Sequence, residues 1–489
     1  MPDKEKTAKS KYSKLLINTF LIGFGTFGSK LLVFLLVPLY TALLTTAEYG
    51  TADLLAQTAN LLMPMASIGV ANAAFRMVAD GKEGEERKKI FSSCFAWLSI
   101  GFLVFLVLST VFFFIPYYRG YEWLVILYVL CADIHQVCAY YLRGIDKTRF
   151  FALQGIFNTA VTIGLNLLFL MVFGMGVTGY VLSVILADFL STVLIFVCTG
   201  IGKDLSFRAV EKESMRQIVQ YSAPLIFSTI LWWVTDVSDR FMVTYFHGDS
   251  VNGIYTVSYK IPTLLTLVTG VFYEAWQYSA VSESKDPQEL NRFYKVVYEG
   301  FSGALFMLCS LIILACRWIA SFWFDPDYYE AWQYIPTLLL ATVFSSLVTF
   351  LGSVYLVKKT TVKSMLTAGL AAGINLVLNL IWIPKWGPIG AALATLICYF
   401  VVYFIRRYSA WRDVGLSLCW IRFPISLLAL GAAAFCMTRQ VPHDYLWAAG
   451  LTVLVWGVNI PSEWKAFRVF RTAFTRRKNN KKEVIDEEI

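Results

Sequence analysis

Residues 177–199 read VTGYVLSVILADFLSTVLIFVCT, an apolar run that is interrupted by one charged side chain, Asp188. A transmembrane α-helix needs about 20 mostly apolar residues to cross the hydrocarbon core of a bilayer. The run meets that length and does not alternate apolar with polar residues, as a membrane β-strand would. It therefore predicts a membrane-spanning helix.

The rest of the chain has the same character. Of its 489 residues, 57 % are hydrophobic and 15 % are charged, and the mean hydropathy is +0.61. A soluble domain carries about 25 % charged residues, so an ordinary soluble enzyme, a disordered protein and a collagen-like fibre are excluded. We expect an all-α integral membrane protein with about fourteen transmembrane helices. The expected spans are 14–40, 47–78, 90–115, 122–142, 150–173, 177–199, 217–246, 252–281, 293–316, 331–357, 362–383, 388–408, 420–438 and 443–461.

The loops between these spans predict the orientation. Lysine and arginine collect in cytoplasmic loops, and most of the 42 basic residues fall on the side that holds both termini. The opposite loops hold Arg119, Arg317, Lys385 and Arg439. Both termini are therefore expected in the cytoplasm. The net charge of +9 then reflects topology and contact with anionic lipids, and no nucleic-acid partner is expected.

The cysteines and the N-terminus do not change this interpretation. The nine cysteines lie almost all in apolar runs without CxxC spacing, and there are three scattered histidines. We expect no metal site and no disulfide framework. The apolar run after the basic segment 1–14 is too long for a signal peptide, so it is expected to remain as the first helix.

An internal repeat divides the chain. Tyr141 begins a stretch that continues through Asn158 and Asn166 to a GVTG sequence, and Tyr355 begins a stretch that continues through Asn375 and Asn379 to a GPIG sequence. The copies are six spans apart and so cross in the same direction, as in parallel-repeat transporters. The expected domains are lobes 1–202 and 203–410, two added spans in 411–463, and a basic cytoplasmic tail in 464–489.

Charged residues within the spans mark a candidate site. A charge at the centre of a membrane helix costs roughly 2.5–3.5 kcal/mol on insertion scales, so it needs a partner or a wet cavity. Basic residues in a central cavity would suit a phosphate or pyrophosphate; they are Lys30, Arg240, Lys260 and Arg76. Arg240 could instead neutralise Asp236 or Asp239, since Asp236 is four residues away on one helix face. Lys30 could snorkel, and Arg76 could anchor at the interface.

Acidic residues within spans suggest a second role. Asp236, Asp239 and Glu274 are candidates to bind Na⁺ or H⁺ and so couple transport to an ion gradient. Ion pairing accounts equally well for the first two. No other cofactor is expected. The chain has no P-loop, GxSxG or HExxH motif and no large outer loop, so we expect no enzyme activity.

Three stretches carry a family resemblance. Residues 375–395 read NLVLNLIWIPKWGPIGAALAT. Residues 38–76 contain Glu48-Tyr49-Gly50 and Ile68-Gly69-Val70, and residues 221–276 contain Pro224, Asp239-Arg240 and Gly253-Ile254-Tyr255-Thr256-Val257. In this order they resemble the eleventh-to-twelfth, first-to-second and seventh-to-eighth helices of the polysaccharide biosynthesis, or oligosaccharide flippase, family. That family belongs to the multidrug/oligosaccharidyl-lipid/polysaccharide exporter superfamily.

The resemblance implies a V-shaped fold of two six-helix lobes in a bacterial cytoplasmic membrane. It implies a flippase for undecaprenyl-pyrophosphate-linked oligosaccharide, serving O-antigen, capsule or exopolysaccharide assembly, with glycan polymerase machinery as a further partner. Lys30 and Arg240 are placed like basic cavity residues of the related lipid II flippases, although the fuller arginine set of those flippases is absent. The alternatives are a cation-coupled multidrug antiporter of the same superfamily, a membrane glycan polymerase or ligase, and a scaffold for a glycan machine.

Overall fold

The computed structural model describes residues 28, 31–32, 34–79, 84–282, 287–358, 360–416 and 421–486. Within these ranges all regular elements are helices, and no strand occurs. The chain forms two compact units. The N-terminal unit comprises Met1–Val257, Trp323–Tyr329 and Asn379–Pro388, and the C-terminal unit comprises Ser258–Phe322, Glu330–Leu378 and Ile389–Ile489. The lobes expected from the repeat remain a prediction.

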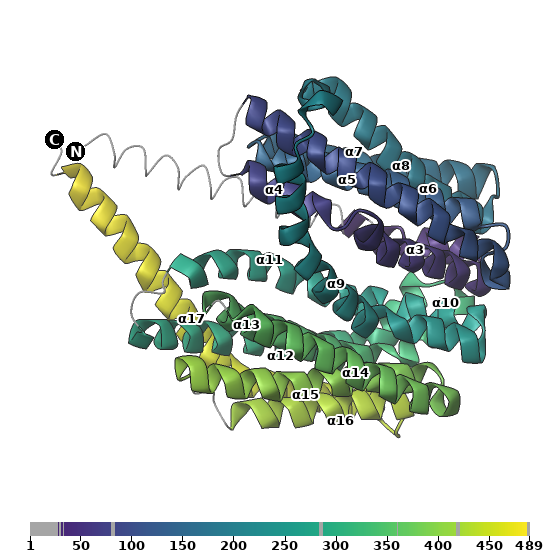
Figure 1. Cartoon of the computed structure of the whole chain (residues 1–489). Coiled ribbons are helices and arrows are strands. Elements are labelled where there is room, and N and C mark those ends of the chain that lie inside the picture. The colour runs from purple at the N-terminus through teal and green to yellow at the C-terminus, as the bar shows by residue number, and fades with distance from the viewer. Residues whose placement is uncertain are drawn as a thin grey trace. The chain divides into compact units, whose positions relative to one another are not determined.

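The N-terminal unit is organised around α6 (Glu122–Gly144), which contacts α3, α4, α5, α7 and α8 (Figure 1). Its other helices are α2 (Val37–Leu43), α3 (Thr46–Ala66), α4 (Val70–Val78), α5 (Glu85–Ser109), α7 (Thr148–Asn166), α8 (Gly176–Thr199), α9 (Lys212–His247) and most of α10 (Asp249–Ser258). Short elements connect them: η1 (Thr110–Phe114), η2 (Pro116–Tyr118), the π-helical η3 (Leu167–Val172), η4 (Ile201–Asp204) and η5 (Phe207–Ala209).

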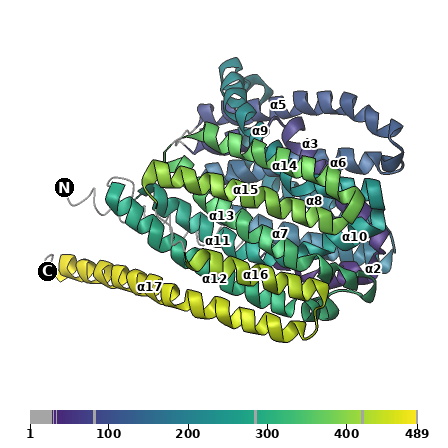
Figure 2. The ribbon, with the colours of Figure 1, turned by 90° about the horizontal axis from the view of Figure 1, so that it is seen from below.

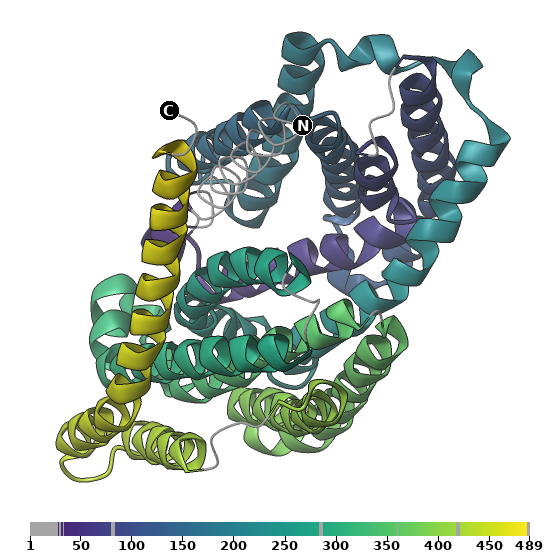
Figure 3. The same ribbon diagram turned by 90° about the vertical axis from the view of Figure 1, so that its left-hand side faces the viewer.

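The C-terminal unit packs around α13 (Ile335–Val357), which contacts α11 and α16. Its other elements are α11 (Lys260–Ser282), α12 (Pro287–Trp323), the second half of η6 (Pro326–Gln333), most of α14 (Thr361–Trp386), α15 (Pro388–Val414), α16 (Arg422–Arg439) and α17 (Asp444–Asp486). Phe350 of α13 anchors the core, because Trp276 stacks on it with ring centroids 4.8 Å apart. The far end of α17 projects beyond its neighbours α12 and α16 (Figures 2 and 3).

Ten helices in the described residues are long and apolar enough to cross a membrane, and the bent pair α3–α4 makes an eleventh. The three other predicted spans fall on α10–α11, on α16 and on a first segment that lies mostly outside the described residues. The chain is therefore a multi-pass membrane protein, and the count of fourteen remains a prediction.

The outer surface fits a lipid solvent. Many large apolar residues are highly exposed, including Phe114 at 83 %, Val197 at 78 % and Phe322 at 85 %. In water, exposed apolar surface of this extent marks an interaction site or an aggregation hazard. In a bilayer the acyl chains cover it.

Helix α3 has a defined start and a defined break. At its start, the Thr45 hydroxyl accepts a hydrogen bond from the Glu48 backbone N–H, and the Glu48 carboxylate accepts one from the Thr45 N–H at 2.9 Å, which is a capping box. At its end the chain bends by 54° into α4. Gly69 occupies the left-handed region there with φ 62°, a conformation that glycine adopts without steric cost.

Two glycines let α3 and α10 approach closely within the N-terminal unit. A Cβ atom built on Gly253 would lie 1.9 Å from the Thr46 carbonyl oxygen, and one built on Gly50 would lie 2.2 Å from the Asp249 carbonyl oxygen. The Asn252 side chain adds a 3.3 Å hydrogen bond to the Gly50 carbonyl. Small residues permit this backbone contact between membrane helices, which explains the glycines in the Tyr49-Gly50 and Gly253-Ile254-Tyr255 sequences.

We therefore expect Gly253→Ala to separate α3 from α10 and to destabilise the protein by about 1–3 kcal/mol or more, because overpacking forces backbone shifts. The matched control is Gly155→Ala on α7, where nothing lies within 4 Å of the added Cβ. The thermal unfolding midpoint in detergent measures both variants. Equal midpoints for Gly253→Ala and Gly155→Ala would contradict the steric role of the crossing.

Candidate functional site

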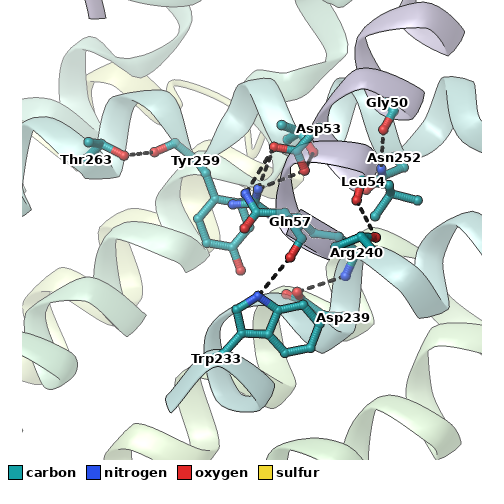
Figure 4. A network of polar contacts seen from close by, with 12 residues as sticks. Gly50, Asp53, Leu54, Gln57, Trp233, Asp239, Arg240, Asn252, Tyr259 and Thr263 are labelled. Atoms are coloured by element: carbon teal, nitrogen blue, oxygen red, sulfur yellow. Dashed lines mark hydrogen bonds and ion pairs between the residues drawn. The ribbon is translucent and has the colours of Figure 1, made fainter. Parts of the chain in front are cut away.

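The candidate site lies in the N-terminal unit, where α3, α9 and α10 meet (Figure 4). Nη1 of Arg240, on α9, donates to both carboxylate oxygens of Asp53, on α3, at 2.8 Å each. The two side chains are only 11 % and 10 % exposed. The pair therefore places a guanidinium and a carboxylate together in a largely desolvated position.

Further polar groups hold both acidic residues of this site. The Thr256 hydroxyl donates to Asp53 Oδ2 at 3.2 Å, and the Gln57 amide approaches Asp53 Oδ1 at 3.4 Å. Asp239 is completely buried, and its Oδ2 accepts a 2.7 Å hydrogen bond from the Tyr255 hydroxyl. Its Oδ1 accepts the backbone N–H of Arg240 at 2.9 Å. These bonds fix the α9 segment that carries Arg240.

A residue of η2, which lies outside the expected membrane spans, holds the first residue of α10. The Tyr117 hydroxyl, in η2, donates to the Asp249 carboxylate at 3.2 Å. Partial burial raises the pKa of Asp249 above its usual value. This contact anchors the helix that supplies Tyr255 and Thr256 to the site.

The contacts along α9 show where Arg76 lies relative to Arg240. Ser222 donates to the Gly69 carbonyl at the α3–α4 break, whereas Arg240 reaches Asp53 near the start of α3. About 27 Å of α9 separates these contacts, at about 1.5 Å per residue. Arg76 is exposed in the last turn of α4, beyond the break, and so lies at a different level from Arg240.

The other predicted site residues are placed as follows. Asp236 is exposed on α9, one turn before Arg240, and Asp239 is buried beside Arg240. Lys260 is the first residue of α11 and belongs to the C-terminal unit. Glu274 lies on α11, and its side chain is outside the description. Lys30 lies outside the described residues.

Sequence reasoning missed the residues that complete the site. Asp53 lies within an expected span, but nothing in the sequence links it to Arg240, because the two residues are 187 positions apart. Tyr255 and Thr256 were seen only as part of a motif. A usable signal existed on α3, where Asp53, Gln57 and Asn60 recur at helical spacing among apolar residues.

A second polar cluster lies among α3, α6, α7 and α8 of the same unit. His135 Nδ1 is 2.9 Å from Asp188 Oδ1, and His135 Nε2 is 2.7 Å from Gln154 Oε1. The Asn158 amide donates to the same Asp188 oxygen at 2.8 Å. A cavity of about 330 Å³ adjoins this cluster and is also lined by Asn60 and Gln136.

The C-terminal unit contains a cavity of a different kind. Its volume is about 360 Å³, and its walls come from α11, α12 and α17. Leu265, Phe272, Phe301 and Leu308 are among the lining side chains, and Glu463 is the one charged group among the described residues of the lining. Such a surface suits an apolar ligand.

The model of a family described as "Polysaccharide biosynthesis protein" matches residues 15–277, which is more than half of the chain. The chain belongs to this polysaccharide biosynthesis family. The matched region contains Asp53, Arg240, Tyr255 and Thr256, so the whole candidate site lies within the family-defining part of this family member. A comparison with curated proteins finds no match.

Solved structures show the fold of this family member. A lipid II flippase MurJ in an inward closed conformation is similar with a TM-score of 0.69 and 16 % identity, covering 94 % of this chain and 99 % of that one. An inward-facing multidrug resistance MATE family transporter of the MOP superfamily is similar with a TM-score of 0.62 and 14 % identity, and the match covers 82 % of this chain and 99 % of that one. A MOP superfamily transporter from Pyrococcus furiosus is similar with a TM-score of 0.58 and 13 % identity, and the match covers 81 % of this chain and 96 % of that one.

The Arg240–Asp53 pair makes a direct prediction for this family member. We expect Asp53→Ala to cost roughly 3–5 kcal/mol, because it leaves the Arg240 charge buried without this carboxylate. The double variant Asp53→Ala/Arg240→Ala should be more stable than the sum of the single losses predicts. Thermal unfolding midpoints of the four proteins in the cycle provide the measurement.

The control for this cycle is a surface ion pair. Lys88 and Glu85 are 2.7 Å apart, and the Glu85 side chain is 75 % exposed. Glu85→Ala should leave the unfolding midpoint nearly unchanged, because exposed ion pairs contribute little to stability. Additive losses at Asp53 and Arg240 would show that the two side chains are not coupled.

Proposed function

We propose that this protein flips undecaprenyl-pyrophosphate-linked oligosaccharide from the cytoplasmic to the outer leaflet of a bacterial cytoplasmic membrane by alternating access. The observation that carries the proposal is the largely buried Arg240, held by Asp53 within the membrane-spanning part of the chain. An intramembrane arginine is costly to maintain and marks a functional site. A pyrophosphate is the ligand chemistry that a guanidinium recognises best.

The geometry supports an exchange of partners at Arg240. In the structure Asp53 supplies the negative charge that Arg240 requires. A pyrophosphate offers more negative charge and more acceptor oxygens than one carboxylate, so it can replace Asp53 at the guanidinium. Thr256 and Gln57 remain beside Asp53 to compensate its carboxylate after the exchange.

The apolar cavity of the C-terminal unit supports a lipid-linked substrate. Its lining of leucine, valine and phenylalanine side chains suits an isoprenoid chain, which makes no hydrogen bonds. The cavity is described within the C-terminal unit alone, and it supports the apolar, isoprenoid character of the proposed substrate.

Other residues have subsidiary roles in the proposal. Lys30, Lys260 and Arg76 supply further positive charge along the route of the pyrophosphate. Asp236, Asp239 and Glu274 are the candidates for Na⁺ or H⁺ coupling. The side chains of Asp236 and Asp239 can be compared. Asp236 is the more accessible of the two, because Asp239 is completely buried.

The cellular setting follows from the same substrate. Both termini lie in the cytoplasm, and the basic side of the protein contacts anionic lipids. The flipped glycan becomes available at the outer leaflet for O-antigen, capsule or exopolysaccharide assembly, where glycan polymerase machinery is the expected partner.

Proteoliposomes that hold a fluorescent undecaprenyl-pyrophosphate oligosaccharide test the function. We expect leaflet exchange to require the protein and to fall at least about tenfold in Arg240→Ala, the loss expected from one charge-assisted hydrogen bond. Arg240→Lys should be intermediate, because it keeps the charge but loses the planar fork of donors. A dithionite-quenching assay measures the rate.

Two variants separate function from folding. Arg119→Ala removes an exposed arginine outside the spans and should exchange lipid at the wild-type rate. Asp53→Ala/Arg240→Ala removes the cation together with its counter-ion and should remain inactive although it is folded. Wild-type exchange by a folded Arg240→Ala would refute the role of Arg240. Efflux of an organic cation without exchange of any lipid in a panel of glycans would favour the antiporter.

A further inference from the structure

The cavity of about 330 Å³ in the N-terminal unit has no role in the Arg240 site. It lies among α3, α6, α7 and α8, which form one group of helices in Figure 1. Its volume falls in the range of about 300–1,000 Å³ that is typical of small-molecule sites. Its lining is mixed, because amide, phenol, imidazole and carboxylate groups converge on it.

The charged groups of the lining compensate each other. Both ring nitrogens of His135 face oxygen atoms, of Asp188 and of Gln154. The Asp188 carboxylate is thereby satisfied within the protein, and no ring nitrogen of His135 is left for a ligand. Among the described residues that line the cavity there is no lysine or arginine. The cavity therefore suits an uncharged polar ligand better than a phosphate or an organic cation.

Two amides of the lining are available to such a ligand. Asn60 on α3 and Gln136 on α6 are exposed. Within the described part of the chain, neither side chain forms a hydrogen bond to another protein group. Unsatisfied amides are costly in a membrane domain, so each requires water or a ligand. Each amide offers both a donor and an acceptor, which matches a hydroxyl group that also does both.

Helix α3 connects this cavity to the Arg240 site. Asp53, Gln57 and Asn60 are spaced i, i+4 and i+7 and so form one polar stripe along the helix. Asp53 binds Arg240 at one end of the stripe, and Asn60 lines the cavity at the other end. The two ends are separated by about 10 Å along the helix axis.

From this arrangement we propose that the cavity binds a sugar ring. It is the subsite for the uncharged, hydroxyl-rich part of a glycan, with Asn60 and Gln136 bonding its hydroxyls and Tyr128 and Tyr140 facing its apolar C–H surface. The assignment rests on the proposed function in one respect, namely that the ring belongs to the same molecule whose pyrophosphate engages Arg240. The polar stripe of α3 then extends from the proposed pyrophosphate site at Arg240 to the proposed sugar subsite at Asn60.

Binding measurements with three probes test the subsite. The probes are polyprenyl pyrophosphate, the same lipid carrying one N-acetylhexosamine, and a free photoreactive N-acetylhexosamine. Full-length protein in nanodiscs is compared with Asn60→Ala/Gln136→Ala and with the control Asn72→Ala, an exposed amide on α4 that does not line the cavity. Size-exclusion profiles and unfolding midpoints verify that all three proteins are folded.

We expect the wild type and Asn72→Ala to bind the glycosylated lipid about tenfold more tightly than the bare lipid. The double variant should lose this advantage and keep its affinity for the bare lipid, as expected for two lost hydrogen bonds. The free sugar should crosslink to peptides of α6 that include Tyr128 or Tyr140. Retention of the sugar advantage by the double variant, or equal loss for both lipids, would overturn the subsite.

The free sugar separates this inference from the proposed function. Crosslinking of the free sugar to α6, together with no binding of either lipid, would support the subsite and refute the lipid-linked substrate. Tight binding of both lipids to the wild type without any sugar advantage would support the pyrophosphate site and refute the subsite.

Discussion

The close approach of α3 and α10 at Gly50 and Gly253 is the constraint on which the candidate site depends. Without a side chain at either position, each backbone lies against a carbonyl of the other helix. This approach brings Thr256 within 3.2 Å of Asp53 and keeps Tyr255 where its hydroxyl meets Asp239. The absence of side chains at the two glycines thus allows α10 to lie where it holds the carboxylates of Asp53 and Asp239 beside Arg240.

The ion pair itself is better understood as a functional element than as a source of stability. Desolvation of two charges offsets much of their attraction, and apolar residues of similar volume often stabilise a core as well. A buried pair in a membrane protein therefore needs a reason beyond stability. A guanidinium kept charged and in place by an exchangeable carboxylate provides one, because it can accept an anionic ligand without a large change in local charge.

The sequence was sufficient for those features that depend on local pattern. Apolar runs located the helices, and the motif around Gly253 identified a segment that proved to line the site. The partner of Arg240 depended on long-range packing. Helical spacing favoured Asp236, and the structure shows Asp53 as a partner that α3 brings to Arg240. The polar stripe of Asp53, Gln57 and Asn60 was visible as a pattern, but its meaning required the cavity at Asn60 and the charge at Asp53.

The distribution of contacts among helices suggests how substrate binding can lead to movement. The cavity of about 330 Å³ that His135 lines is formed by α3, α6, α7 and α8, whereas Arg240 belongs to α9. Helix α9 contains Pro224, which removes one backbone hydrogen bond within the helix and weakens it there. In the proposed function a pyrophosphate replaces Asp53 at Arg240, and α9 then loses one of its polar connections to α3. The four helices that line the cavity do not include α9, so the exchange at Arg240 does not remove a wall of the proposed sugar subsite. In the proposed function the anionic part of the substrate therefore acts on a helix whose backbone a proline weakens, whereas the sugar contacts helices that do not carry Arg240.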